Sequence, residues 1–79
     1  MPTIYFPDVP EYQPFIRILC LRADTQCKHS RDYVSVVSAG EIVIRREETG
    51  LFEAVWFGAL VGGFDGNVVR FDADELRIN

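Results

Sequence analysis

The stretch Leu60-Val61-Gly62-Gly63-Phe64-Asp65-Gly66-Asn67-Val68-Val69-Arg70-Phe71 contains the clearest local structural signal in the chain. An Asp-Gly pair between two apolar runs is typical of a type I′ turn, because that turn requires positive φ at both central residues. Pairing outward from Asp65-Gly66 places Leu60 opposite Phe71 on one apolar face. We therefore predict a β-hairpin over this stretch.

The residues before this stretch predict a second hairpin. Two apolar-rich runs, Glu41–Glu47 and Leu51–Val61, are separated by Glu48-Thr49-Gly50, and a glycine there can take the positive φ of a tight loop. A two-residue loop would place Phe52 and Trp56 on a half-polar face, whereas a three-residue loop would place Trp56 on the apolar core face. Glycines at positions 58, 62 and 63 favour a bulge or a sharp bend that curls the sheet.

The first half of the chain contains fewer turn signals. Prolines at positions 2, 7, 10 and 14 predict an extended lead-in over residues 1–14, with regular structure beginning after it. Phe15–Arg22 has apolar residues at both odd and even positions, so both faces of a strand would be apolar, and this predicts a buried central strand. Tyr33–Val37 favours a strand because its valines lose rotamer freedom in a helix. Asp74–Ile78 fits a short helical turn or a closing strand.

These segments together predict one compact domain over residues 1–79. Its composition, 48% apolar and 25% charged, is that of a folded domain. The fold that we expect is mainly β: a small antiparallel meander sheet or a partly open barrel of four to five strands, with at most one short helix. The alternative is an α+β fold in which a helix near residues 30–39 packs against the same sheet.

The charge distribution argues against direct binding to nucleic acid. The net charge is −4, and a negative protein is repelled by the phosphate backbone. Residues 1–40 contain four acidic and four basic residues, whereas residues 41–79 contain eight acidic residues and four arginines. This asymmetry favours an acidic surface for a basic protein partner.

No pattern in the chain indicates catalysis, a cofactor or a metal. Cys27-Lys28-His29, with Cys20 and Asp24 nearby, has ligand types that suit zinc but too few of them for a structural site. The chain start lacks a signal-peptide pattern and no long apolar run is present, so we expect a cytoplasmic protein, outside membranes, with reduced thiols at Cys20 and Cys27. We expect a non-enzyme that binds neither metal nor cofactor.

The remaining candidate function is protein binding. Ten aromatic residues in 79 exceed what so small a core needs, and aromatic anchors with an acidic rim are typical of binding hot spots. The candidate partner-binding residues are Glu47, Glu48, Phe52, Glu53, Trp56, Asp72, Asp74 and Glu75.

In its short length, acidic charge, single domain and lack of motifs, the chain resembles the small anti-CRISPR inhibitors encoded by phages and mobile elements. The resemblance implies stoichiometric binding to a CRISPR–Cas effector subunit in a bacterial cytoplasm, which would block access of target DNA or recruitment of a nuclease. The acidic residues named above would then occupy a basic nucleic-acid groove, with polar and aromatic contacts beside them. Monomer and homodimer both fit.

Two other functions are open. A structural or assembly β module would homo-oligomerise through an exposed edge strand or apolar face. A small metal or thiol protein would use Cys20, Cys27 and His29.

Overall fold

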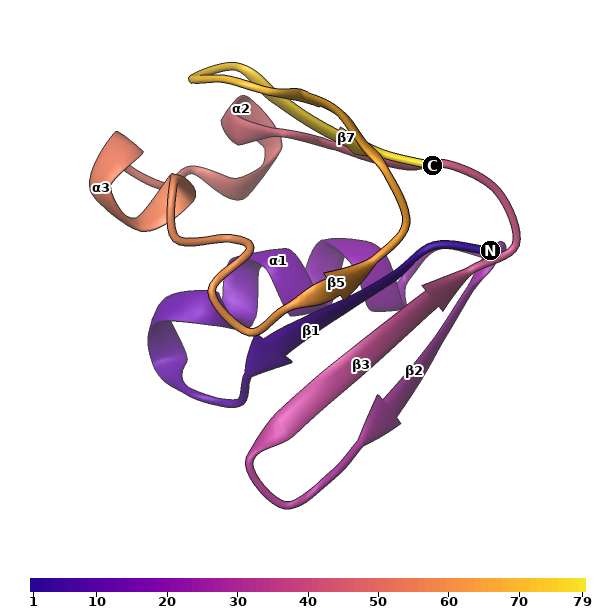
Figure 1. The fold of residues 1–79 in the computed structure, drawn as a ribbon. Coiled ribbons are helices and arrows are strands. Elements are labelled where there is room, and N and C mark those ends of the chain that lie inside the picture. Colours follow the sequence, from indigo (N-terminus) through magenta and orange to yellow (C-terminus); the bar gives the residue numbers. More distant parts are fainter.

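The computed structural model describes residues 1–79 as two antiparallel sheets with short helices between them (Figure 1). The first sheet has the order β2-β3-β1-β5, with bounds Thr25–His29, Tyr33–Ser38, Thr3–Pro7 and Phe64–Asp65. The second has the order β4-β7-β6, with bounds Ile42–Arg45, Glu75–Ile78 and Val68–Phe71. The helices are η1 (Pro10–Tyr12), α1 (Gln13–Cys20), α2 (Arg46–Thr49) and α3 (Glu53–Trp56). The mainly antiparallel β fold is confirmed, although its seven strands form two sheets and its helices number more than one.

One hydrophobic core joins the two sheets. A chain of aromatic contacts runs through it from Phe6 on β1 to Phe15 on α1 (ring centroids 5.2 Å apart), then to Trp56 (5.8 Å) and to Phe71 on β6 (6.0 Å). Apolar side chains from every sheet strand except β2, β5 and β6 are fully buried around it. These four aromatic residues therefore help to hold the two sheets together.

The expected lead-in is in fact part of the fold. Residues Thr3–Pro7 form β1, which pairs with β3 over five residues and with β5 on its other side. Its buried positions alternate, with Ile4 and Phe6 turned inward. The prediction that regular structure begins after Pro14 is wrong, because Pro2 precedes this strand and Pro7 is its last residue, which leaves the central ladder intact.

The strand predicted over Phe15–Arg22 is also wrong, since α1 occupies most of this segment. Pro14 lies in the first turn, where its missing N–H costs nothing. Phe15, Ile16 and Leu19 are buried, and this spacing puts them on one face of a helix. An apolar run of this length suits a buried strand or a helix, and packing against the first sheet decides between them.

The two cysteines form a disulfide, which corrects the expectation of reduced thiols. Cys20 at the end of α1 is bonded to Cys27 on β2, and no cysteine is free. The bond ties the helix to an edge strand of the first sheet. Helix formation over residues 13–20 is what brings Cys20 to this strand.

The hairpin expected from Glu41–Glu47 and Leu51–Val61 does not form. β4 ends at Arg45 and the chain turns into α2, where the Arg45 N–H donates to Glu48 Oε2 at 3.1 Å. Gly50 does adopt positive φ, at 68°, but as the C-terminal cap of α2. The second predicted strand contains α3 and then a series of turns.

Asp65-Gly66 connects the two sheets and does not close a hairpin. β5 before it pairs with β1, and β6 after it pairs with β7. Gly66 has φ of 130°, and a Cβ there would lie 2.7 Å from the carbonyl oxygen of Asn79, so the close approach requires glycine. The type I′ prediction is therefore wrong.

The strand predicted over Tyr33–Val37 is confirmed, and of the two structures left open for Asp74–Ile78 the closing strand is the one that forms. Tyr33–Ser38 is β3, which rules out the alternative helix near residues 30–39. Glu75–Ile78 is the closing strand β7, central in the second sheet. The longest helix has eight residues, and none of the helices could cross a membrane.

Candidate binding surface

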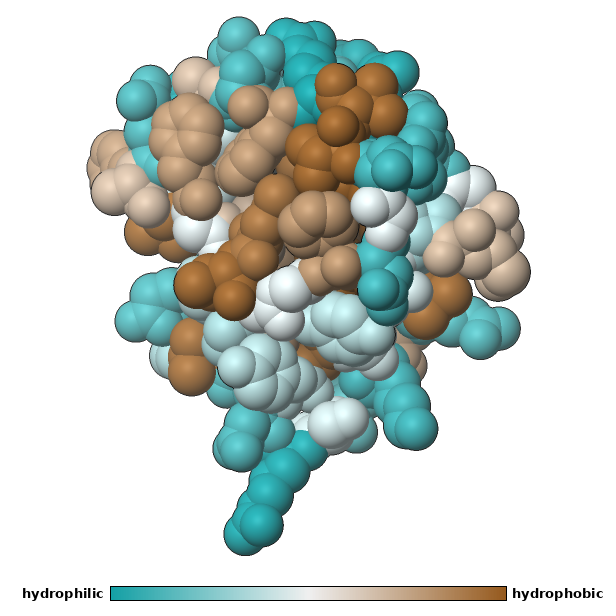
Figure 2. All heavy atoms as spheres, viewed as in Figure 1, coloured by the Kyte–Doolittle hydropathy of each residue, from teal (hydrophilic) through white to brown (hydrophobic).

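Exposed hydrophobic side chains are concentrated in one segment of the chain. Ten large hydrophobic residues are exposed, and six of them fall between positions 52 and 71. Figure 2 shows brown and tan side chains gathered over α3, the turns that follow it and β6. We call this surface the apolar face; its members are Phe52, Phe57, Val61, Phe64, Val68 and Val69.

An open groove of about 670 Å³ adjoins the apolar face. It lies between the β4–α2 segment and the turn that joins β6 to β7, and Phe52 belongs to both surfaces. We call it the polar groove; its lining residues are Arg45, Arg46, Glu47, Gly50, Leu51, Phe52, Arg70, Asp74 and Glu75. Four of these were predicted from the sequence to contact a partner: Glu47, Phe52, Asp74 and Glu75.

Glu75 is buried and acts as the shared acceptor of an arginine cluster. Arg77 Nη2 lies 3.2 Å and Arg70 Nη1 3.4 Å from its Oε2, and Arg45 Nε lies 3.8 Å from its Oε1. A buried carboxylate with three guanidinium partners has its charge compensated within the protein. Glu75 therefore stabilises the second sheet and is not available to a partner.

Asp72 holds the turn between β6 and β7. Its Oδ2 accepts a hydrogen bond from Arg70 Nε at 2.7 Å, and its Oδ1 accepts the backbone N–H groups of Asp74 and Glu75, both at 2.9 Å. The bond from Arg70 and then these backbone donors lower the pKa of Asp72 to about 2, while the bond to Asp72 raises the pKa of Arg70. All three donors favour the charged carboxylate.

Two more predicted site residues have structural roles. Trp56 is fully buried, and its Nε1 donates to the carbonyl oxygen of Asp72 at 2.6 Å. Glu48 accepts the Arg45 N–H and lies 3.6 Å from Arg22 Nη2, so it holds the start of α2. Of the two placements left open for Trp56, the core placement is the one observed, because α3 turns its side chain into the core between the sheets; as a partner-binding candidate Trp56 is therefore wrong.

The other four predicted residues are exposed, and their side chains make no polar contact within the protein. Glu47, Glu53 and Asp74 make no ion pair and no side-chain hydrogen bond, and Phe52 is 84% exposed. All four lie in the second half of the chain, on or beside the polar groove.

The sequence reasoning missed most of the apolar face. Phe57, Val61 and Val69 fell within predicted strands and were not singled out as candidates for binding. Val61 is instead 70% exposed, on the turns after α3. The glycines at 58, 62 and 63 were the available signal, because so many in one segment favour turns over a strand.

The cysteines and the histidine do not form a reactive site. Cys20 and Cys27 are joined in the disulfide, and the structure contains no group of three or more metal-ligating residues. The thiol alternative thereby loses its nucleophile while the bond is intact.

Comparisons of this chain with protein-family models, with curated proteins and with solved structures found no match.

Proposed function

We propose that this protein is a non-catalytic module that acts by stoichiometric binding to a protein partner through the apolar face. The observation that carries the proposal is the concentration of six exposed large hydrophobic residues between positions 52 and 71. Contiguous exposed apolar surface on a small domain is costly in water, and it is typical of a protein interface.

The charges around the apolar face specify the chemistry of the partner. Glu47, Glu53, Asp65 and Asp74 are exposed near it. The basic residues of the adjoining groove have partners within the protein: Arg70 pairs with Asp72, Arg46 donates to backbone carbonyls, and Arg45 lies 3.8 Å from Glu75. The complementary surface is therefore apolar at its centre and basic at its rim.

The specific form of this function that we propose is inhibition of a bacterial CRISPR–Cas effector. A subunit that binds nucleic acid presents a basic surface, which an acidic module with an apolar centre complements. Binding there would block target DNA or recruitment of a nuclease, with no catalysis by this protein.

The disulfide links this proposal to the compartment. A disulfide persists in an oxidising environment, whereas a bacterial cytoplasm keeps most thiols reduced. An inhibitor acting in the cytoplasm must therefore fold and bind with Cys20 and Cys27 reduced. Binding by the Cys20→Ala, Cys27→Ala variant tests this requirement directly.

The test uses a phage-interference assay and a matched pair of variants. In a bacterium whose CRISPR system targets a phage, expression of the wild-type protein should restore plaque formation, and the tagged protein should retain the effector in pull-downs. Val61→Asp should abolish both effects by placing a charge in the apolar face. Leu21→Asp is the control, because Leu21 is exposed outside that face.

Two results would overturn the proposal in part or in whole. If wild-type protein restores no plaques against a panel of CRISPR types but retains a protein that Val61→Asp loses, the module stands and the inhibitor assignment is wrong. If the wild type and Val61→Asp retain the same proteins, the apolar face is not the binding surface.

Self-association is the second candidate function, because β6 is an edge strand of the second sheet with two exposed valines. Sheet edges are usually blocked by charge or by covering groups. At the edge strand β4, Arg22 Nη1 donates to the Val43 carbonyl at 2.6 Å, and β5 has only two residues. β6 exposes Val68 and Val69. Sedimentation of a dilution series should then show a dimer that Val69→Lys dissociates; a monomer at all concentrations rejects this alternative.

A further inference from the structure

We propose that the polar groove receives one arginine side chain of the protein partner, between the carboxylates of Glu47 and Asp74 and against the ring of Phe52. The inference rests on the proposed function, since it specifies how the basic rim of the partner is recognised.

The first argument is the state of the groove's own charged groups. Three arginines and three acidic residues line it, so its formal charge is zero. Arg46 is committed to the chain, donating from Nε to the Ala73 carbonyl at 2.5 Å and from Nη1 to the Leu51 carbonyl at 3.2 Å. Arg70 is committed to Asp72 and Glu75.

The acidic residues differ from the arginines in this respect. Glu75 is buried among its partners, but Glu47 and Asp74 are exposed without an ion pair. The groove therefore has two carboxylates whose acceptor capacity is unused by the protein. A ligand with several N–H donors and a positive charge satisfies them.

The second argument is Phe52, which lies on the wall of the groove with 84% of its surface exposed. It makes no aromatic contact with the core, unlike Phe57 and Phe71, whose rings lie 5.6 Å apart. An aromatic ring in the same groove as two carboxylates favours arginine over lysine, because a guanidinium stacks on a ring while its planar edge donates to carboxylates.

Arg45 should weaken the binding of such a ligand, so its removal should change the affinity in the opposite direction from removal of the carboxylates. Its side chain is 60% exposed and its Nε lies 3.8 Å from Glu75, so it is the one lining arginine that solvent largely surrounds. Its charge repels an incoming guanidinium. Arg45→Gln should therefore strengthen binding, whereas loss of the carboxylates should weaken it.

The probe is N-acetyl-arginine N-methylamide, titrated into the full chain while backbone amide chemical shifts are recorded. The matched control ligand is the citrulline analogue, which has the same shape and no charge. We expect arginine to shift resonances of residues 45–52 and 70–75 at millimolar concentration, with citrulline about tenfold weaker. The Glu47→Gln, Asp74→Asn variant should bind about tenfold more weakly and Phe52→Ala about threefold, while Arg45→Gln should bind about twofold more tightly.

Equal shifts with arginine and citrulline, shifts outside the groove, or unchanged binding by the Glu47→Gln, Asp74→Asn variant would each overturn the proposal. These changes are at exposed side chains, and unchanged thermal unfolding confirms that each variant is folded. The outcome is separable from the proposed function. If this double variant captures the partner as the wild type does while Val61→Asp does not, the arginine site is wrong and the binding module stands.

Discussion

The two halves of this chain bury their apolar residues to different extents. In residues 1–39, β3 pairs with β1 and with β2 over five residues each, and the disulfide ties α1 to β2. In residues 41–79 the pairs are shorter, a register shift interrupts the β6–β7 pair, and most of the exposed large hydrophobic residues are found. The first half thus forms the longer strand pairs, with β5 of the second half completing its sheet, whereas the second half exposes more large hydrophobic side chains.

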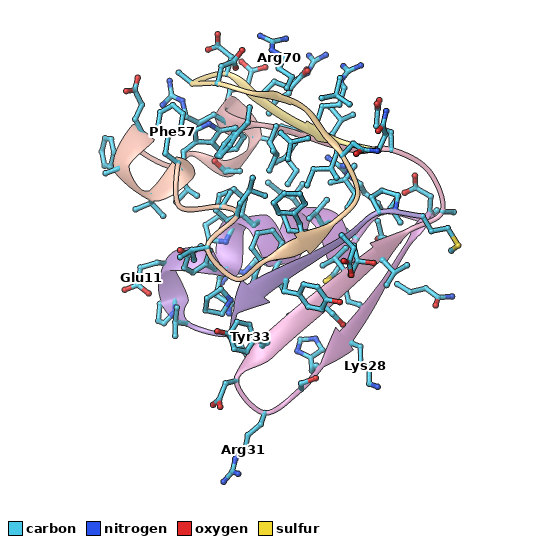
Figure 3. All side chains as sticks on the ribbon, viewed as in Figure 1. Glu11, Lys28, Arg31, Tyr33, Phe57 and Arg70 are labelled. Carbon is cyan, nitrogen blue, oxygen red and sulfur yellow. A yellow bond between two sulfur atoms is a disulfide. The ribbon has the colours of Figure 1, made fainter.

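The charges follow the same division. The first half is balanced, and the entire net charge of −4 belongs to the second half. In Figure 3, Lys28 on β2 and Arg31 at the tip of the β2–β3 hairpin lie at one end of the molecule, and Phe57 and Arg70 lie at the other end. A rigid support with a charged, apolar outer surface is the arrangement expected of a binding module.

The largest effect on stability is expected from a substitution in the core between the two halves. Trp56→Ala removes the side chain that packs against Phe15 on one side and Phe71 on the other. We expect a loss of about 3–5 kcal/mol in the free energy of unfolding, from lost burial and a cavity. Urea unfolding measures it, and Phe52→Ala, an exposed aromatic change, should stay within about 0.5 kcal/mol of the wild type. Similar losses in both variants would contradict the division into core and surface aromatics.

The second effect concerns the first half alone. Cys20→Ala, Cys27→Ala opens a loop whose ends are seven positions apart. Chain entropy predicts a loss of about 2–3 kcal/mol, because the unfolded chain gains freedom. Amide hydrogen exchange through local opening should become faster in β2 and α1. In β7, exchange through local opening should stay as in the wild type. Equal acceleration in both sheets would show that the halves do not differ in this way.

A third, smaller effect is expected in the second half. Glu75→Gln leaves Arg45, Arg70 and Arg77 without their shared carboxylate. Because these guanidiniums remain partly exposed to water, we expect a loss of about 1–3 kcal/mol in unfolding free energy, less than for a fully buried pair. Thermal unfolding at low and high salt measures this loss. If the variant is as stable as the wild type, the ion pairs of Glu75 do not contribute to stability.

The smallest effect is a pH dependence at Asp72. Its folded pKa, about 2, lies below the ordinary 3.8, so its contribution to stability is present above 3.8 and is lost as the pH falls toward 2. The stability difference between the wild type and Asp72→Asn should therefore be constant near neutral pH and narrow through this acidic window. If the stability difference stays constant down to pH 2, the charged Asp72 carboxylate does not hold the turn between β6 and β7.

Local signals in the sequence identified several features correctly. The valines of Tyr33–Val37 form a strand, Gly50 takes positive φ, and Glu47, Phe52, Glu53 and Asp74 are exposed. Each of these depends on the side chain itself or on near neighbours. Charged side chains such as Glu47, Glu53 and Asp74 are mostly exposed in folded proteins, whatever the fold.

The errors share a different origin. Phe15–Arg22 could bury its apolar residues as a helix or as a strand, and Asp65-Gly66 could close a hairpin or connect two sheets. The choice between these alternatives depends on which distant strands are available for pairing. β1 pairs with β5 from about sixty residues away, and β7 pairs with both β4 and β6. Glu48 and Glu75 also gain a partner from a distant segment, since Arg22 after α1 lies 3.6 Å from Glu48 and Arg45 on β4 lies 3.8 Å from Glu75. Asp72 is held by its own near neighbours in the turn, a local signal that the sequence analysis did not use.

The sequence by itself determined the mainly β character, the acidic second half and the lack of a recognisable catalytic pattern, because composition and short-range preference are properties of the chain. Only the tertiary structure decided which strands pair, that Cys20 reaches Cys27, and that Trp56 is buried while Phe52 is exposed. Those outcomes depend on which distant apolar surfaces can be covered together, and that competition is resolved over the whole chain.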